Sequence, residues 1–420
     1  MDNISSGNSI EMDYAIIDAQ NDTQSLGVYV EILRRKDARQ IDENELYRLV
    51  FDYLKERKIN QTLVKCENAP ISDLVEEITI NQPFWFQNAK FEDVQFFAYT
   101  VNSHAAEMET IETADGDMED IPASQHWILP NREFQGLWEF LYFEDDLKEN
   151  LLRFSKSLML FAEKKVDTNA ISCNKLILLH GPPGTGKTSL SKALAHKISI
   201  HMSSKFRYTH LFEINSHSLF SKWFSESGKL VMKMFTTIKD VCHDAESLVV
   251  ILIDEVESIA YARDTVSIQQ EPSDSLRVVN AVLTQLDQLR NHSNVLVLTT
   301  SNLSGTIDIA FVDRADLKQF IGFPSIPAIF HIFKSAIDEL VKVQIVINET
   351  EDKKWGSANI ERLLDIAKKS QGLSGRSLRK LPLLAHAWFI HSEKVDLLTF
   401  LVALDGAVEK HLTDISAISK

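Results

Sequence analysis

Cysteine is scarce in this sequence. The chain has three cysteines in 420 residues, at Cys66, Cys173 and Cys242, and no two of them form a CxxC pair. So few cysteines, odd in number and widely separated, argue against a disulfide framework. They are typical of reduced thiols in a cytosolic or nuclear protein.

Long apolar runs are missing as well. The longest purely aliphatic stretch, LVVILI at 248–253, is far shorter than the roughly 20 residues needed to cross a bilayer. The N-terminal residues lack a basic segment followed by an apolar one, so we expect no secretory signal. We therefore expect no membrane partner.

Positive charge is also in short supply. Asp and Glu number 60 against 44 Lys and Arg, which gives a formal net charge of -16. Affinity for a phosphate backbone comes mainly from Lys and Arg, so direct nucleic-acid binding is not expected. The hydrophobic content of 44% is ordinary for a globular protein, and the length allows two or three domains.

The first hundred residues combine strand and helix patterns. The runs VYVEIL, VEEITI and VQFFAYTVN predict strands. Asp42 stands before the amphipathic segment ENELYRLVFDYLKER, where its side chain would cap a helix. We predict a small α+β domain over residues 1–103.

The segment EMETIETADGDMED, at 107–120, has seven acidic residues and no basic one. Such a run is usually a solvated, flexible stretch of chain. We therefore expect an acidic linker over residues 104–125, before a second domain.

Beyond the linker, short apolar runs alternate with helical patterns. Three runs have the composition of parallel strands that are buried on both faces: KLILLH at 175–180, LVVILID at 248–254 and NVLVLTTSN at 294–302. This alternation predicts a three-layer α/β domain, which we place at 126–325. After Pro327 only helical patterns follow, so we predict a helical domain over 326–420.

The segment HGPPGTGKTSL follows a predicted strand and opens a predicted helix, and it contains GxxxxGK[ST]. Its glycines let backbone N–H groups turn inward around phosphates, and the helix N-terminus adds positive partial charge. We assign nucleotide binding to eight residues: Gly181, Pro182, Pro183, Gly184, Thr185, Gly186, Lys187 and Thr188. Lys187 would reach the β- and γ-phosphates, and the Thr188 hydroxyl would ligate Mg²⁺. The full pattern disfavours the alternative of a tight turn without a ligand.

Two acidic residues end the strand in ILIDEVES. Asp254 stands at the end of an apolar strand, where a carboxylate without a partner is costly to place. This position suits a second-sphere contact with Mg²⁺. Glu255 could orient and deprotonate a water that attacks the γ-phosphate. The alternative is a helix N-cap that complements the helix dipole, but the accompanying phosphate loop favours catalysis.

A third predicted strand ends in TTSN. Its Asn302 is a neutral hydrogen-bonding group that could align the attacking water, or else a turn-forming residue. No NKxD-type guanine reader follows the phosphate loop, so we expect ATP rather than GTP.

These motifs together resemble the AAA+ ATPases: GPPGTGKT, ILIDE, TTSN and a helical tail with GLSGR. The resemblance is most specific to the pachytene checkpoint protein 2 family, the metazoan thyroid-receptor-interactor AAA+ proteins. It is carried by SKWFSESGK, AFVDRADLKQFIGFP and GLSGRSLRKLPLLAHAWF. It extends from about Ile128 to the C-terminus and is only general before that.

The resemblance implies a P-loop parallel sheet with a C-terminal helical lid, preceded by the α+β domain, which would bind the substrate or adaptor. It also implies a homo-hexameric ring that uses ATP and Mg²⁺ to unfold or remodel HORMA-domain proteins, recruited through a HORMA adaptor. The family acts in meiotic chromosome synapsis and recombination control and in the spindle checkpoint. The implied location is nuclear, chromosomal and cytoplasmic, with the kinetochore or spindle included.

Three residues acquire roles through the resemblance. Asn302 resembles the sensor-1 polar residue, and Arg376 in GLSGR resembles the sensor-2 arginine of the lid. Arg314 is the candidate finger that would enter a neighbouring subunit's site. Many relatives have two arginines spaced three apart here, whereas this chain has Arg314 between Asp313 and Asp316. A local Arg–Asp surface pair is the alternative.

In SKWFSESGK, two large rings stand in a polar segment. In a AAA+ ring this segment would form a loop facing the central pore, and we assign substrate contact to Lys222, Trp223 and Phe224. Aromatic rings can grip an extended polypeptide by area and shape. The alternative is that Trp223 and Phe224 pack into the body of the assembled subunit ring or against each other. RDTVSIQQEPSDS, at 263–275, is either a second pore loop or a surface insertion.

The leading hypothesis is an ATP-driven protein remodeller. The alternative is a nucleic-acid-directed AAA+ ATPase such as a clamp loader or helicase, which would favour basic pore residues and a basic accessory domain. A non-hydrolysing nucleotide switch or scaffold is a third hypothesis. It gives no reason for an intact water-activating carboxylate at Glu255.

Overall fold

The computed structural model describes residues 27–59, 61–67, 69–111, 121–144, 146–215, 227–257, 273–302, 309–347 and 355–418. The chain divides into two compact units, Met1–Val101 and Asn102–Lys420, and each is described by itself. Within those described ranges, no helix combines the length and the apolar character needed to cross a bilayer.

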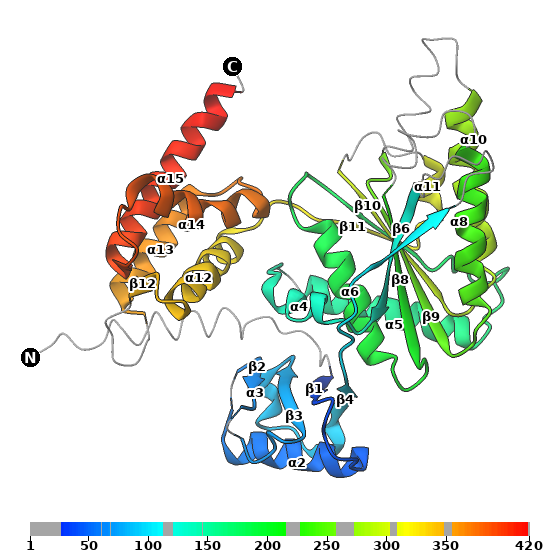
Figure 1. The fold of residues 1–420 in the computed structure, drawn as a ribbon, viewed down its shortest axis with the longest axis horizontal. Helices are drawn as coiled ribbons and strands as arrows, with labels where there is room; N and C mark the ends of the chain where they lie inside the picture. The colour runs from blue at the N-terminus through cyan, green and yellow to red at the C-terminus, as the bar shows by residue number, and fades with distance from the viewer. Residues whose placement is uncertain are drawn as a thin grey trace, which may run out of the picture. The chain divides into compact units, whose positions relative to one another are not determined.

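The first unit is a four-stranded sheet covered by one long helix (Figure 1). Its elements are β1 (Val28–Arg34), α2 (Glu43–Glu56), β2 (Leu63–Lys65), β3 (Val75–Ile80), α3 (Pro83–Phe86), η1 (Phe91–Asp93) and β4 (Val94–Tyr99). The strand order is β2-β3-β1-β4, with β1 antiparallel to β3 and parallel to β4. The Asp42 carboxylate accepts hydrogen bonds from the N–H groups of Asn44 and Glu45, which confirms the predicted helix cap.

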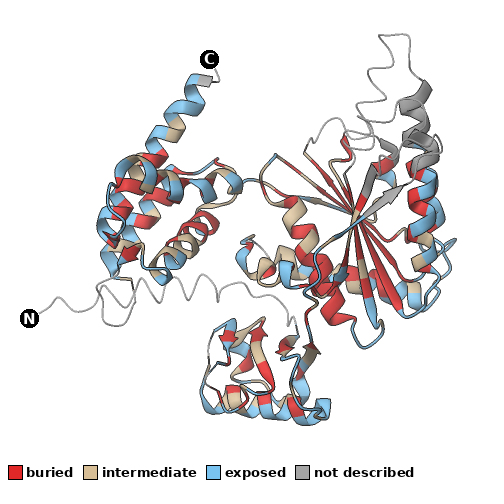
Figure 2. Cartoon of the chain, in the orientation of Figure 1, coloured by how far each residue is buried: buried red, intermediate tan, exposed pale blue. Residues whose placement is uncertain are grey.

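The second unit is built on a seven-stranded sheet. Its strands are β5 (Glu107–Ile111), β6 (Ile121–Leu129), β7 (Leu176–His180), β8 (Tyr208–Asn215), β9 (Ser247–Asp254), β10 (Val295–Ser301) and β11 (Leu317–Phe320). The order is β11-β7-β10-β9-β8-β6-β5, and the first five strands are parallel. The three predicted buried strands are confirmed as β7, β9 and β10. β9 and β10 are buried along almost their whole length (Figure 2).

Helices cover both faces of this sheet. They are α4 (Leu137–Phe140), α5 (Leu147–Glu163), α6 (Lys187–His201), α8 (Ser227–Cys242), α10 (Ser273–Leu289) and α11 (Ile309–Arg314), with η2 (Arg132–Phe134) before α4. α8 and α10 share a hydrophobic core with one face of the sheet, and α6 packs on the other with α5 beside it (Figure 1). The predicted three-layer arrangement is therefore confirmed.

Parts of the segment expected to be a linker form strands instead. β5 and the first residues of β6 lie within 104–125, and the two strands pair antiparallel. The reason lies further along β6, where Trp127 and Leu129 are buried and the strand pairs with β8. Because β6 extends the sheet in this way, the acidic strand β5 adds to its edge.

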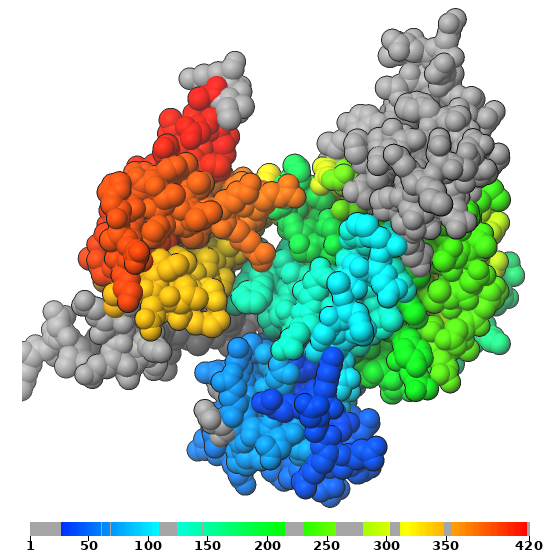
Figure 3. Space-filling view, viewed as in Figure 1, coloured from blue at the N-terminus to red at the C-terminus, as the bar shows by residue number. Residues whose placement is uncertain are grey.

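The C-terminal part of the second unit is a helical lid. Its elements are α12 (Ile326–Lys342), β12 (Val346–Ile347), α13 (Ser357–Lys369), α14 (Gly375–Phe389), β13 (Val395–Asp396) and α15 (Leu397–Ile418). The four helices are those predicted, but the expectation of helices alone missed the two-residue parallel pair β12–β13. Val346 and Val395, both buried, face each other in that pair and join the core of the lid. In Figure 3 the lid runs from yellow to red, and the surface is hollowed beside it.

Candidate functional site

The phosphate loop connects β7 to α6, and three of its glycines have positive φ. The φ angles are 148° at Gly181, 75° at Gly184 and 96° at Gly186, where a side chain would be strained. A Cβ at Gly181 would also lie 2.1 Å from the carbonyl oxygen of Ile321. The loop therefore requires glycine at these positions. It leads directly into the N-terminus of α6, whose free N–H groups and helix dipole favour a bound anion.

Lys187 begins α6, and its side chain is buried inside the loop. Its Nζ donates hydrogen bonds to the carbonyl oxygens of Gly181 (2.9 Å) and Pro182 (2.7 Å). Burial lowers the pKa of Lys187, and the carboxylates of Glu257 and Asp254 act against that effect. The site therefore contains a poorly solvated cation for which a phosphate would be a better partner than two carbonyl groups.

A hydroxyl and a carboxylate meet beside the lysine. Thr188 Oγ1 donates to Asp254 Oδ1 at 2.8 Å, and Thr300 Oγ1 donates to the same oxygen. Mg²⁺ prefers such hard oxygen ligands and usually takes one or two carboxylates together with substrate phosphates. The described ranges contain no cluster of three or more His, Cys, Asp or Glu that could cage a metal. Thr188 and Asp254 therefore fit a magnesium ion that is shared with a bound nucleotide.

Glu255 follows the end of β9 in a strained backbone conformation. Its φ is 57°, a left-handed value that costs about 1–3 kcal/mol for a residue with a side chain. Thr300 on β10 holds this conformation, because its Oγ1 accepts from Glu255 N (3.2 Å) and its carbonyl accepts from Val256 N (2.9 Å). Asn302 Nδ2 then donates to Glu255 Oε1 at 3.4 Å. The turn thus places the Glu255 carboxylate beside an amide from the next strand.

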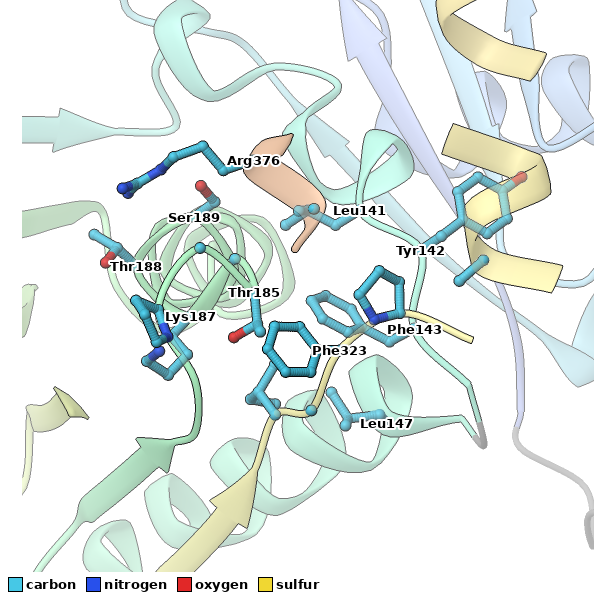
Figure 4. Close-up of a pocket in the computed structure, with 18 of the residues that line it drawn as sticks. Leu141, Tyr142, Phe143, Leu147, Thr185, Lys187, Thr188, Ser189, Phe323 and Arg376 are labelled. Atoms are coloured by element: carbon cyan, nitrogen blue, oxygen red, sulfur yellow. The ribbon is translucent and has the colours of Figure 1, made fainter. Parts of the chain in front are cut away.

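Lys187, Thr188, Asp254, Glu255 and Asn302 line one cavity of about 870 Å³. It lies at the carboxyl ends of the strands, which is where open α/β sheets bind ligands. Beside the phosphate loop the lining is polar, with Lys187, Thr188 and the Asp254–Glu255 pair. Elsewhere it is largely apolar, and in Figure 4 Phe143 and Phe323 lie close together there. The apolar residues are Phe140, Leu141, Tyr142, Phe143, Leu147, Phe320, Ile321, Phe323, Ala328 and Ile332. A ligand with a flat apolar group and an anionic tail fits this division.

The lid closes one side of the cavity through the first turn of α14. The backbone N–H of Arg376 donates to the carbonyl of Gly184 at 3.1 Å, and the Arg379 guanidinium donates to the carbonyl of Phe140 at 3.1 Å. Arg376, Arg379 and Lys380 all line the cavity. A helix N-terminus and three cations therefore add positive potential opposite the phosphate loop.

Comparisons with known proteins agree with this geometry. Residues 177–323 match the model of the ATPase family associated with various cellular activities (AAA), and residues 347–412 match the TRIP13-like, AAA+ ATPase lid C-terminal domain. The pachytene checkpoint protein 2 homolog of Rattus norvegicus is 52% identical over 320 residues, which cover 73% of this chain and 74% of that protein. The chain belongs to the pachytene checkpoint protein 2 family.

Other members of the family give the same result. The Homo sapiens homolog is 52% identical over 315 residues, which cover 72% of this chain and 73% of that protein. The solved structure of C. elegans PCH-2 matches with a TM-score of 0.76 and 33% identity, over 92% of this chain and 99% of that one. The E. coli MS115-1 HORMA:CdnC:Trip13 complex contains a chain of the same fold, with a TM-score of 0.52 and 19% identity. Like its relatives in the pachytene checkpoint protein 2 family, the chain is an ATP-hydrolysing AAA+ enzyme.

Arg314, the candidate arginine finger, does not line the cavity. It ends α11, and its guanidinium donates to both carboxylate oxygens of Asp287 on α10, at 2.8 and 2.9 Å. This pairing lowers the pKa of Asp287. Neighbouring Asp316 instead accepts from the backbone N–H groups of Asn174 and Leu176. Within one chain Arg314 is therefore paired, and its role toward a neighbouring subunit stays a prediction.

The predicted pore-loop residues Lys222, Trp223 and Phe224 lie outside the described residues. The same holds for most of the predicted second loop, since 258–272 are not described. Both assignments stay predictions that follow from the family resemblance.

Sequence reasoning missed several residues of the site, and two of them, Thr300 and Glu257, contact predicted catalytic residues. Thr300 organises both acidic residues at the end of β9, and Glu257 accepts a hydrogen bond from Asn302. Thr300 precedes Asn302 by two residues in TTSN, and Glu257 follows Glu255 by two in DEVE. Both lay inside motifs already singled out, but their contacts depend on β9 and β10 being neighbours.

Proposed function

We propose that this enzyme is a homo-hexamer that uses ATP hydrolysis to remodel HORMA-domain proteins, recruited through a HORMA adaptor. We place its action in meiotic chromosome synapsis and recombination control and in the spindle checkpoint, with nuclear, chromosomal and cytoplasmic locations. Family membership supports this, together with the shared fold of a chain in the HORMA:CdnC:Trip13 complex. The observation that carries the ATPase part is the convergence of Lys187, Thr188, Asp254, Glu255 and Asn302 on one cavity.

The cavity suggests how the chain binds its substrate. The apolar end would take the adenine of ATP, and the N–H groups of the phosphate loop would take the phosphates with Lys187. Thr188 and Asp254 would hold Mg²⁺, which neutralises charge on the phosphates when it is bound. Arg376 would contact the γ-phosphate from the lid.

Hydrolysis needs a positioned water and a base. The amide of Asn302 would hold the water next to Glu255, whose carboxylate takes a proton as the water oxygen attacks the γ-phosphorus. The bond from that phosphorus to the β–γ bridging oxygen breaks, and ADP leaves with the bridging oxygen. The strained turn at Glu255 supports this role, because it would hold the carboxylate in position before the substrate arrives.

A hexamer would complete the site with Arg314 of a neighbouring subunit, which acts on the γ-phosphate in trans. To reach the γ-phosphate in a neighbouring subunit, the Arg314 guanidinium would have to break its hydrogen bonds to Asp287 or divide its donors between Asp287 and the phosphate. Mixing Arg314→Ala with Glu255→Gln subunits tests this role. Some interfaces then combine an intact base with an intact finger, so partial recovery of ATPase is expected. No recovery would favour a local role for Arg314.

Substrate handling is assigned to two regions. Trp223 and Phe224, with Lys222 beside them, would grip the polypeptide in the pore. The first unit would dock the substrate or adaptor. Its Phe84 and Trp85 are 63% and 61% exposed and pack edge to face at 5.9 Å, which gives that unit an aromatic surface for a protein partner.

The test is ATPase activity with HORMA proteins and, separately, with single-stranded DNA. Stimulation by protein is expected, whereas stimulation by DNA alone would favour a nucleic-acid-directed machine. Trp223→Ala should keep basal ATPase and substrate capture but lose remodelling. Deletion of residues 1–105 should lose capture itself. Loss of basal ATPase in Trp223→Ala would place that ring in the core.

A further inference from the structure

Glu257 is a carboxylate buried beside the ATPase site that the mechanism above does not use. It lies two residues after Glu255, and only 6% of its surface is exposed. Its Oε1 accepts a hydrogen bond from the backbone N–H of Asn302 at 3.1 Å. Its Oε2 is also buried and has no hydrogen-bond partner among the described residues. Because an unpartnered buried carboxylate is costly, the hydrogen bond from the Asn302 N–H is the contact that fixes the position of this side chain within the described part of the chain.

Asn302 connects this carboxylate to the proposed catalytic base. Its backbone N–H donates to Glu257, and its side-chain Nδ2 donates to Glu255 Oε1 at 3.4 Å. Both groups are attached to one Cα, so the hydrogen bond to the backbone limits the directions in which the amide can point.

We infer that Glu257 is a positioning residue for ATP hydrolysis. It holds the backbone at the end of β10, so that the Asn302 amide stays directed at Glu255 and at the water between them. A displacement of about 1 Å at such a centre can reduce the rate about 100-fold. The inference rests on the roles proposed for Glu255 and Asn302.

The experiment compares three variants of the full chain by the kcat and KM of ATP hydrolysis. Glu257→Ala should lower kcat about 10- to 100-fold and change KM less than about twofold, because Glu257 does not line the cavity that would bind ATP. Glu257→Gln keeps an acceptor oxygen at the same reach and should recover most of the rate. Glu257→Asp keeps the charge but withdraws the oxygen by one methylene, so it should stay slow. If Glu257→Asp is as active as Glu257→Gln or more so, charge rather than reach matters and the inference is wrong.

A double-mutant cycle tests the route through Asn302. If Glu257 acts through that residue, Glu257→Ala should add little to the loss already caused by Asn302→Ala. Independent, multiplicative losses would overturn the inference. Glu257→Asp, which should also stay slow, completes the cycle if the alanine variant folds poorly.

Glu213→Ala is the matched control. Glu213 on β8 is a half-buried carboxylate paired with Lys192 at 2.8 Å, outside the cavity lining. Glu213→Ala should lower thermal stability without a change in kcat. If its kcat falls as far as that of Glu257→Ala, loss of any buried carboxylate would slow the enzyme and Glu257 would have no special role. Glu255→Gln distinguishes a failure of the proposed hydrolysis mechanism from a failure of the inference about Glu257. If it hydrolyses ATP normally, the proposed mechanism fails, whereas an inactive Glu255→Gln beside a fully active Glu257→Ala refutes this inference alone.

Discussion

The two walls of the ATP cavity are built differently. On the sheet side, side chains from adjoining strand ends are linked to one another. Asp254 accepts from Thr188 and Thr300, and Asn302 donates to Glu255. On the lid side, contact with the other wall runs through backbone carbonyls, which accept from the Arg376 N–H and the Arg379 guanidinium.

This difference suggests a division of labour. Linked side chains at the ends of buried strands cost little reorganisation during the reaction, so they suit the chemical step. Hydrogen bonds from a separate helical layer can form and break as that layer moves, so they suit the sensing of the nucleotide. Substitutions on the sheet side should therefore change kcat, and substitutions on the lid side should change affinity. Lys187 is the exception on the sheet side, because in the proposed complex it would contact the phosphates directly.

The largest expected effect is that of Glu255→Gln. The amide cannot take the proton of the water, so turnover should fall about 10²- to 10⁴-fold while ATP affinity stays the same. Single-turnover hydrolysis and equilibrium ATP binding check both parts. Normal hydrolysis by this variant would remove Glu255 from the chemical step.

Lys187→Ala should weaken ATP binding about 10- to 100-fold, because a charge-assisted contact to phosphate is lost. Calorimetric titration with ATP measures the effect. Lys192→Ala, on the same helix but outside the cavity lining, is the control and should bind normally. Unchanged affinity in Lys187→Ala would contradict the phosphate-loop assignment.

Thr300→Val tests whether the sheet side owes its rate to preorganisation. Valine has a similar shape but cannot accept from Glu255 N or donate to Asp254, so kcat should fall about 10-fold with little change in affinity. Thr299→Val is the matched control, since Thr299 Oγ1 bonds to the carbonyl of Ile177 instead. Equal losses in the two variants would show a general effect on the strand.

Arg376→Ala should have the smallest effect, a fall in ATP affinity of about 2- to 5-fold, because a solvent-accessible charge contributes modestly. Its backbone hydrogen bond to Gly184 would remain. If kcat falls as far as in Glu255→Gln while affinity is kept, the lid takes part in the chemical step. The division between the two walls would then be wrong.

The sequence predicted the parts of the site that local pattern determines. A glycine-rich loop between an apolar strand and a helix, and acidic residues after a second strand, are visible without a structure. The contact of Glu257 with Asn302 spans 45 residues and follows from strand order, which no local pattern encodes. The partner of Arg314 is also distant in sequence. The local pattern draws attention to the acidic neighbours Asp313 and Asp316, but the guanidinium pairs with Asp287, which lies 27 residues earlier on α10.

The fold, like the site, contains elements that local pattern predicts and elements that it does not. Strands buried on both faces and amphipathic helices were predicted well, because their periodicity follows from burial. The acidic segment was expected to be a linker on its composition, yet β5 pairs with β6 at the sheet edge. An edge strand has one neighbour and needs little hydrophobic burial, so its composition resembles that of a loop.

The hydrogen bond between Gly184 and Arg376 has a thermodynamic consequence. It joins the loop that would hold the phosphates to the first turn of α14, so ATP binding and docking of the lid share a coupling free energy. Such coupling is reciprocal: whatever factor a docked lid adds to the affinity for ATP, bound ATP adds to the docking of the lid. Any force that pulls the lid away from the phosphate loop must therefore lower the equilibrium affinity for ATP by that same factor.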